Sequence, residues 1–342
     1  MLSLWLPAAL AADPALLLVG NSYVLTNDLA AVTLAVHTLG GAGTEPGCES
    51  RATPGYTLPQ HLADADGTHG DTPLRDALVT GGRTWDWVVL QDQSQVPGFP
   101  ETEPDFQASL AAVPELDALV DGAGGQTVFL MTWGRRAGDE LNPDLYPDYL
   151  TMQARLAEGY LRYAEAATTD TRTSWVAPVG YAWRHVYQAA LDAGDDPLAA
   201  DALFTRLYQP DGSHPTPLGT WMAACVLYSS TTGRRCTGLD FPDELAEADV
   251  EAIQAAADAA VFEESPELAY PWADEPGGDT GDTDDTGETA DTGDTGDDGV
   301  APAGCGCDAG GARAGGVGGA AFGVAAALRR GSTGRRGGRR PR

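Results

Sequence analysis

Two short segments of the chain hold residue types that together could cleave an ester. Gly20-Asn21-Ser22-Tyr23 follows an apolar run and precedes a helical pattern. The Ser22 hydroxyl would therefore be exposed on a turn where helix-terminal N–H groups can stabilise negative charge. Much later, Asp211 precedes His214 by three residues. At that spacing the carboxylate can turn back to one imidazole nitrogen and leave the other for a serine hydroxyl.

Each motif alone also fits an ordinary structure, a helix N-cap for the serine and a solvated turn for the Asp-His pair. Pro210 and Pro215 lie on either side of the pair and favour a rigid loop over a helix, which is what a placed site needs. Ser94 and Ser213 are alternative hydroxyls in nearby loops. Neither opens a helix after a buried strand, so Ser22 remains the better nucleophile.

Three more side chains near the expected site have open roles. His61 could line a pocket or sit near a helix end, and the second interpretation is preferred. Trp133 and Arg135 follow an apolar run. They could contact a substrate, or they could serve packing and a surface ion pair.

The elements that must position these residues can be read from hydrophobic patterning. Continuous apolar runs predict buried strands at 15–20, 85–91 and 126–132, with a weaker one at 173–179. Helical spacing occupies 27–39, 105–120, 146–166, 183–193, 217–228 and 246–262. Strands and helices alternate, which predicts an α/β fold, a three-layer α/β/α sandwich around a mostly parallel sheet, with the site at the carboxyl ends of the strands.

Composition narrows the function further. The 342 residues carry 50 acids against 20 bases, all of them Arg, for a net charge of -30. Such a charge argues against nucleic acid as a partner, because phosphate binding relies on clustered Lys and Arg. The 43% of hydrophobic residues is enough for a core and excludes global disorder.

The two ends differ in composition from the middle and suggest export. Residues 1–12 are apolar and end in small residues, as in a signal peptide, although a charged start is missing. A folded segment is expected over 13–275, followed at 276–304 by a disordered spacer rich in Asp, Thr and Gly. Residues 305–342 combine a Cys pair, a weakly apolar stretch and an Arg-rich end. They resemble the MYXO-CTERM sorting signals of myxobacterial surface proteins, which implies anchoring to the envelope and a cell-surface or secreted location.

Cysteine spacing predicts no metal site. If the protein is exported, the simplest pair among Cys48, Cys225 and Cys236 joins the last two, although sequence alone leaves the pairing open. Cys-x-x-Cys and His-x-x-x-His spacings are missing, which argues against zinc. The Asp-rich spacer lacks the EF-hand spacing, which argues against calcium.

Four motifs, taken together in chain order, resemble the SGNH (GDSL-like) hydrolase superfamily. They are Gly20-Asn21-Ser22-Tyr23, the run Val-Val-Leu-Gln-Asp-Gln-Ser at 88–94, Met-Thr-Trp-Gly-Arg at 131–135 and Asp-Gly-Ser-His-Pro-Thr at 211–216. The resemblance extends over residues 15–230 and is closest to a bacterial branch with these motifs. It implies a flavodoxin-like sandwich and a serine esterase that needs no metal or organic cofactor.

The resemblance also implies roles for individual residues. Ser22 would be the nucleophile, His214 the general base and Asp211 the group that orients the imidazole. The backbone N–H groups of Ser22 and Gly55 would form part of the oxyanion hole. The third donor in the family is usually an Asn side chain. Here the block reads Gln91-Asp92-Gln93-Ser94, so Gln93 takes that position and Gln91 is the alternative.

These observations predict an exported serine ester hydrolase that acts on a small acyl ester, such as an O-acetyl group on a carbohydrate. Two other functions remain open. The unusual Gln block would also fit a surface-displayed carbohydrate-binding protein built on a hydrolase scaffold that no longer turns over. An acyltransferase would use the same serine and pass the acyl group to an alcohol in place of water.

Overall fold

The structure is a computed structural model that describes residues 14–41, 47–264 and 270. The predicted signal peptide at 1–12, the spacer at 276–304 and the sorting tail at 305–342 lie outside the described residues. Within the described part of the chain, no helix is both long enough and apolar enough to cross a membrane.

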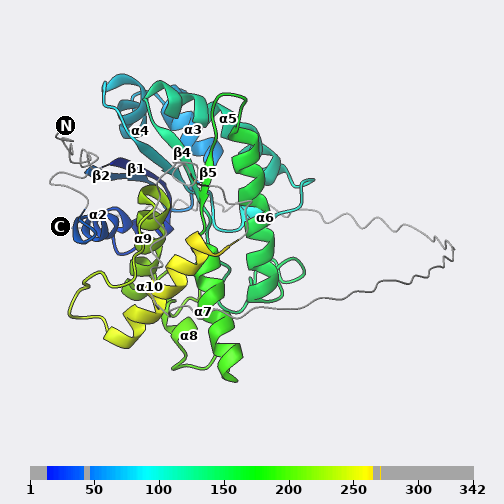
Figure 1. Ribbon diagram of the computed structural model, residues 1–342. Helices are drawn as coiled ribbons and strands as arrows, with labels where there is room; N and C mark the ends of the chain where they lie inside the picture. The colour runs from blue at the N-terminus through cyan, green and yellow to red at the C-terminus, as the bar shows by residue number, and fades with distance from the viewer. Residues whose placement is uncertain (1–13, 42–46, 265–269, 271–342) are drawn as a thin grey trace, which may run out of the picture. The chain divides into compact units, whose positions relative to one another are not determined.

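A five-stranded parallel sheet forms the centre of the fold (Figure 1). Its strands are β1 (Ala15–Gly20), β2 (Gly47–Ala52), β3 (Trp87–Leu90), β4 (Gln126–Leu130) and β5 (Trp175–Ala177). They lie in the order β2-β1-β3-β4-β5, and each neighbouring pair is parallel. The predicted α/β sandwich is confirmed, because parallel strands of this kind require crossover helices that cover both faces.

Helices cover the sheet on two faces (Figure 1). One layer packs α2 (Leu29–Leu39), α7 (Val179–Ala193) and α9 (Pro217–Thr232), and α10 (Glu247–Phe262) lies on α7 and α9. The other layer packs α3 (Leu58–Asp66), α5 (Pro104–Gly122) and α6 (Tyr149–Ala167). Shorter helical segments are α1 (Ser22–Leu25), α4 (Pro73–Arg75), α8 (Leu203–Arg206), a π turn at Asp76–Thr80 and a 3₁₀ turn at Val96–Gly98.

The strands that the apolar runs predicted are the buried ones. Every residue of β1 after Ala15 is buried, and so are three of the four residues of β3. The sequence analysis missed β2, whose residues Gly-Cys-Glu-Ser-Arg-Ala are all only half-buried. This strand lies at the edge of the sheet and has no apolar run to reveal it.

One disulfide links Cys225 of α9 to Cys236 in the segment that follows it, with the two Cα atoms 5.5 Å apart. The simplest predicted pairing is therefore confirmed. Both cysteines are fully buried in the core, and the bridge joins α9 to the connection that leads into α10. Among the described cysteines, Cys48 on β2 is free.

Candidate active site

The Ser22 turn is built at the carboxyl end of the central strand β1. Ser22 is the first residue of α1, and the side chain of Asn21 caps this helix by accepting a hydrogen bond from the Tyr23 N–H. The Asn21 N–H donates to the Gln91 side chain at 2.9 Å. A β-carbon at Gly20 would lie 2.5 Å from that same Gln91 oxygen, so the turn needs glycine for close packing.

Ser22, His214 and Asp211 meet at this turn although they are far apart in the sequence. The His214 Nε2 atom lies 2.9 Å from the Ser22 Oγ atom, and His214 Nδ1 lies 2.6 Å from Asp211 Oδ2. The other Asp211 oxygen accepts the N–H groups of Ser213 and His214 at 2.9 and 3.0 Å. The imidazole is thus held between a carboxylate and a hydroxyl in the arrangement that the Asp-x-x-His spacing predicted.

The Asp211 carboxylate stays ionised at neutral pH. Partial burial alone would raise its pKa, but the hydrogen bonds from the His214 ring and from the backbone of Ser213 and His214 hold the pKa below the ordinary value. A charged carboxylate on Nδ1 favours the tautomer that leaves Nε2 free to accept the serine proton.

Three contacts from other parts of the chain, and one within the loop, hold the loop that carries Asp211 and His214. Asn27 donates its side-chain amide to the Pro215 carbonyl at 3.0 Å, and the Trp133 indole donates to the Ser213 carbonyl at 3.0 Å. The Arg136 N–H donates to the Gly212 carbonyl, while Gln209 closes the loop on His214 through its N–H. Gly212 has a φ of 67°, a backbone conformation that favours glycine.

Gly55 lies in a tight turn that is attached to the Ser22 turn. The Tyr56 N–H bonds the Thr53 carbonyl, and Gly55 has a φ of 75° after a proline, as in a type II turn. The Asn21 amide donates to the Tyr56 carbonyl, which joins the two turns. In the described part of the chain, the N–H groups of Ser22 and Gly55 donate to no other residue. Both donors are therefore available to an incoming oxygen.

The side chains of Gln91 and Gln93 are used differently. Gln91 is fully buried, and its amide bonds the Asn21 N–H and the Asp92 carbonyl, so it supports the turn and faces no solvent. The Gln93 oxygen accepts the Gln95 N–H at 2.7 Å, which orients the amide, and its nitrogen donates to the Gln95 side chain at 3.0 Å. The second hydrogen of the Gln93 nitrogen has no acceptor among the described residues.

Asp92 is a structural residue that the sequence analysis did not recognise. Its carboxylate is fully buried, and it accepts the N–H groups of Leu58 and Gln93 and the Tyr163 hydroxyl. Its carbonyl accepts the Asn21 amide at 3.1 Å. Burial raises the pKa of this carboxyl. Asp92 thus links the turn after β3 to the start of α3 and to α6.

An aromatic stack lies beside the proposed nucleophile. The Tyr23 ring stacks on Trp133 at a centroid distance of 4.6 Å, and Trp133 stacks on Trp183 at 4.2 Å. The Tyr23 hydroxyl is 2.7 Å from the Ser213 hydroxyl, and its ring meets the His214 ring edge-on. Trp133 therefore packs against and positions the loop that carries Asp211 and His214. Ser213, one of the alternative hydroxyls, bonds a tyrosine at this point.

His61 lies in the first turn of α3 and is almost fully buried against Tyr56. Burial lowers its pKa to about 4, and the nearby backbone of Gly20 offsets only part of that effect. The ring is therefore neutral at pH 7. It packs beneath the turn that carries Gly55.

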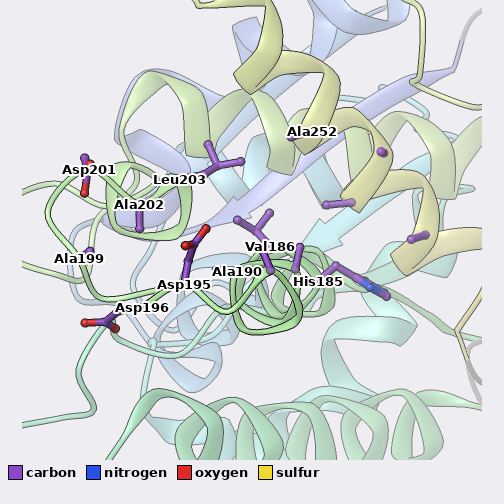
Figure 2. Close-up of a pocket in the computed structure, with 15 residues that line it drawn as sticks. His185, Val186, Ala190, Asp195, Asp196, Ala199, Asp201, Ala202, Leu203 and Ala252 are labelled. Atoms are coloured by element: carbon purple, nitrogen blue, oxygen red, sulfur yellow. The ribbon is translucent and has the colours of Figure 1, made fainter.

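A separate groove of about 770 Å³ lies between α7, α8 and α10 (Figure 2). Its walls are mainly alanines, with Asp195, Asp196 and Asp201 around them, and His185 is paired with Glu264. It contains none of the predicted site residues. Among the described residues, no group of three or more His, Cys, Asp or Glu side chains could hold a metal ion.

No protein-family model and no curated protein matches the chain. Solved structures do. A DUF4886 family protein from Bacteroides uniformis aligns over 74% of this chain and 96% of its own, with a TM-score of 0.54 and 16% identity. A candidate SGNH hydrolase from Slackia heliotrinireducens aligns over 64% of this chain and 99% of its own, with a TM-score of 0.46 and 26% identity. A GDSL-like lipase from Bacteroides thetaiotaomicron aligns over 65% and 89%, with a TM-score of 0.36 and 15% identity. The first of these shows the fold.

Proposed function

We propose that this protein is a serine esterase of the SGNH type that hydrolyses small acyl esters, such as O-acetyl groups on carbohydrates. The observation that carries the proposal is the chain of hydrogen bonds from Asp211 through His214 to the Ser22 hydroxyl. The solved structures similar to this chain include candidate SGNH and GDSL-like hydrolases, which agrees with it.

In the proposed reaction, His214 Nε2 takes the Ser22 proton as Oγ attacks the ester carbonyl. The resulting imidazolium is stabilised by the Asp211 carboxylate. His214 then gives the proton to the leaving alcohol, and an acyl group remains on Ser22. Water, activated by the same histidine, releases the acid and restores the serine.

The negative oxygen of the tetrahedral intermediate needs donors that point at it before the reaction starts. Three candidates surround the turn: the N–H groups of Ser22 and Gly55, and the side-chain nitrogen of Gln93. The free hydrogens of these groups favour this assignment over one that uses Gln91.

We also propose that the protein is exported and held at the cell surface by its C-terminal tail. The buried Cys225–Cys236 disulfide supports export, because disulfides are rare in reducing cytosol. No partner beyond the ester substrate and the envelope is proposed.

The test is hydrolysis of p-nitrophenyl acetate and of acetylated sugars by the full chain and by Ser22→Ala. The substitution is expected to lower kcat by at least about 10³-fold without changing the unfolding temperature. Ser213→Ala serves as the matched control and is expected to keep most of the activity.

Three outcomes are decisive. Equal turnover by the parent and by Ser22→Ala would show that another residue is the nucleophile. A folded parent that binds acetylated sugars without turning them over would support the carbohydrate-binding function. Transfer of the acyl group to an added alcohol in preference to water would identify an acyltransferase.

A further inference from the structure

The segment after β4 begins beside the Ser22 turn and is rigid. Trp133 stacks on Tyr23 and donates its indole N–H to the Ser213 carbonyl. Gly134 donates its N–H to the Gln153 side chain and accepts the Tyr208 hydroxyl at 2.7 Å. The next residue, Arg135, therefore leaves the sheet from a fixed point that adjoins the catalytic loop.

A buried carboxylate holds the Arg135 guanidinium. One of its terminal nitrogens pairs with Asp139, whose side chain is completely buried. Asp139 also accepts the Leu141 N–H, the Asn142 amide and the Gln95 amide. A guanidinium that is held at one edge loses less freedom when its other edge binds a ligand, so the arrangement is preorganised.

Gln95 extends this network to the candidate oxyanion donor. It gives its amide hydrogen to Asp139 and accepts one from Gln93 at 3.0 Å. A continuous set of hydrogen bonds thus runs from Gln93 to Arg135. The two side chains are positioned by the same buried groups, as expected for two parts of one binding surface.

Arg135 has donors that nothing in the described part of the chain uses. A guanidinium has five N–H groups, and the contact with Asp139 is the single hydrogen bond that this side chain makes there. Its Nε is buried without a partner, while the side chain as a whole is 21% exposed. Buried donors without partners are rare in proteins, and such a group calls for a functional explanation.

The charge of Arg135 reaches the residue after the nucleophile. Burial raises the pKa of the Tyr23 phenol, and the positive charge of Arg135 acts in the opposite direction. The neighbouring Arg136 passes along Gly212 of the catalytic loop and makes no ion pair among the described residues. The charge of Arg135 is balanced by Asp139, so the positive charge of Arg136 is the one at this position that no described carboxylate pairs.

We infer that Arg135 binds an anionic group of the substrate, so that the preferred esters carry a carboxylate or sulfate, as acidic sugars do. This inference rests on the proposed esterase function. Guanidinium groups match the planar geometry of carboxylates and bind them through paired hydrogen bonds.

Binding can be tested without turnover. In a full-length Ser22→Ala background, calorimetry compares 4-acetoxybenzoate and 4-nitrophenyl hydrogen adipate, each with its neutral methyl ester. In at least one pair the anion is expected to bind about 10–100-fold more tightly, and Arg135→Met should remove that preference. Arg162→Met, which removes one charge from an exposed ion pair on α6, should keep it. Equal binding of the anion and its neutral ester in both pairs, or a preference that survives Arg135→Met, would overturn the inference.

Turnover distinguishes which side of the ester carries the anion. The 4-acetoxybenzoate pair places the charge on the alcohol, and 4-nitrophenyl hydrogen adipate against its methyl ester places it on the acyl group. One of these pairs should show a preference of about tenfold or more in kcat/KM that Arg135→Met abolishes. No preference in either pair would contradict the inference. Selective binding of the anion without hydrolysis would instead contradict the proposed esterase function, while the inference that Arg135 binds an anion would still hold.

Arg135→Lys is the control for a loss of binding that is caused by unfolding. It keeps a positive charge beside the buried Asp139 but cannot form paired hydrogen bonds. An unfolding midpoint close to that of the parent, with a reduced preference for the anion, is expected. A fully retained preference would mean that charge alone, and no fork geometry, selects the substrate, and that would overturn the assignment of paired hydrogen bonds.

Discussion

Gln91 and Gln93 are two residues apart, yet their hydrogen bonds give them opposite tasks. Gln91 accepts the Asn21 N–H with its oxygen and donates to the Asp92 carbonyl with its nitrogen, so both ends of its amide are used in supporting the fold around the Ser22 turn. Gln93 has its oxygen fixed by the backbone and one hydrogen left over. The same side-chain type is therefore structural at one position and available for chemistry at the other.

Gln93→Glu is expected to lower kcat by about 10²-fold or more while KM changes little. The variant keeps an oxygen that can accept the Gln95 N–H, but it replaces the donor with a negative charge that repels the oxyanion. Steady-state kinetics on p-nitrophenyl acetate would measure the effect. Gln91→Glu offers a comparison, because its main expected effect is a lower unfolding temperature. A Gln93→Glu enzyme with unchanged kcat would remove Gln93 from the oxyanion hole.

At this scale the sequence predicted part of the site. The structure brings Ser22, His214 and Asp211 together. These three residues could be predicted because the turn and the loop that carry them have local signatures in the sequence. The choice between the two glutamines could not be predicted. The choice depends on which amide group is already hydrogen-bonded in the folded protein, and sequence spacing does not predict that.

Among the elements, the turn after β3 connects several parts of the fold around the site. Asp92 in this turn accepts hydrogen bonds from the start of α3, from its own turn and from Tyr163 of α6. It makes no ion pair among the described residues. The carboxylate therefore acts as a shared acceptor.

Asp92→Ala is expected to destabilise the fold by about 3 kcal/mol or more, because three buried donors lose their acceptor. Asp92→Asn keeps one oxygen for the two backbone N–H groups, and its amide nitrogen can donate to the Tyr163 oxygen, so a loss of about 1 kcal/mol is expected. Urea unfolding at pH 7 would measure both. Similar losses in the two variants would show that charge is what matters at this position.

The elements also show where sequence patterning succeeds and fails. β1 begins and ends at the residues that the apolar run predicted, because burial on both faces demands continuous hydrophobicity. β2 was missed since an edge strand with Glu49 and Arg51 has no such demand. The six helices predicted from helical spacing lie at the right places, whereas α3 (Leu58–Asp66) was not predicted. Their ends shifted by a few residues, as at α7, which begins at Val179 and was expected from 183.

For the molecule as a whole, a buried histidine predicts how folding stability depends on pH. The pKa of His61 is about 4 in the folded protein, whereas the pKa of a histidine in an unfolded chain is about 6.5. Below the unfolded value, the unfolded chain takes up a proton that the folded chain refuses. Stability from this group is therefore complete above pH ~6.5 and falls as the pH drops towards ~4.

The free energy of unfolding should accordingly fall by about 2–3 kcal/mol between pH 7 and pH 4.5, and His61→Gln should flatten this slope. Urea midpoints across that range would measure it. His69→Gln, at an exposed histidine paired with Asp64, is the matched control and should keep the slope. Asp211, whose pKa is lowered, should add its own loss at more acidic pH. An unchanged slope in His61→Gln would place the acid sensitivity elsewhere.

The hydrogen bond between Ser22 and His214 joins residues that are 192 positions apart in the chain. A ribosome that adds about 5–20 residues per second needs about 10–40 s to make that stretch. During that interval the nascent chain displays a serine without its base. The proposed activity thus begins late in synthesis, and a polypeptide that terminates before His214 would be inert toward esters however well its first strands had folded.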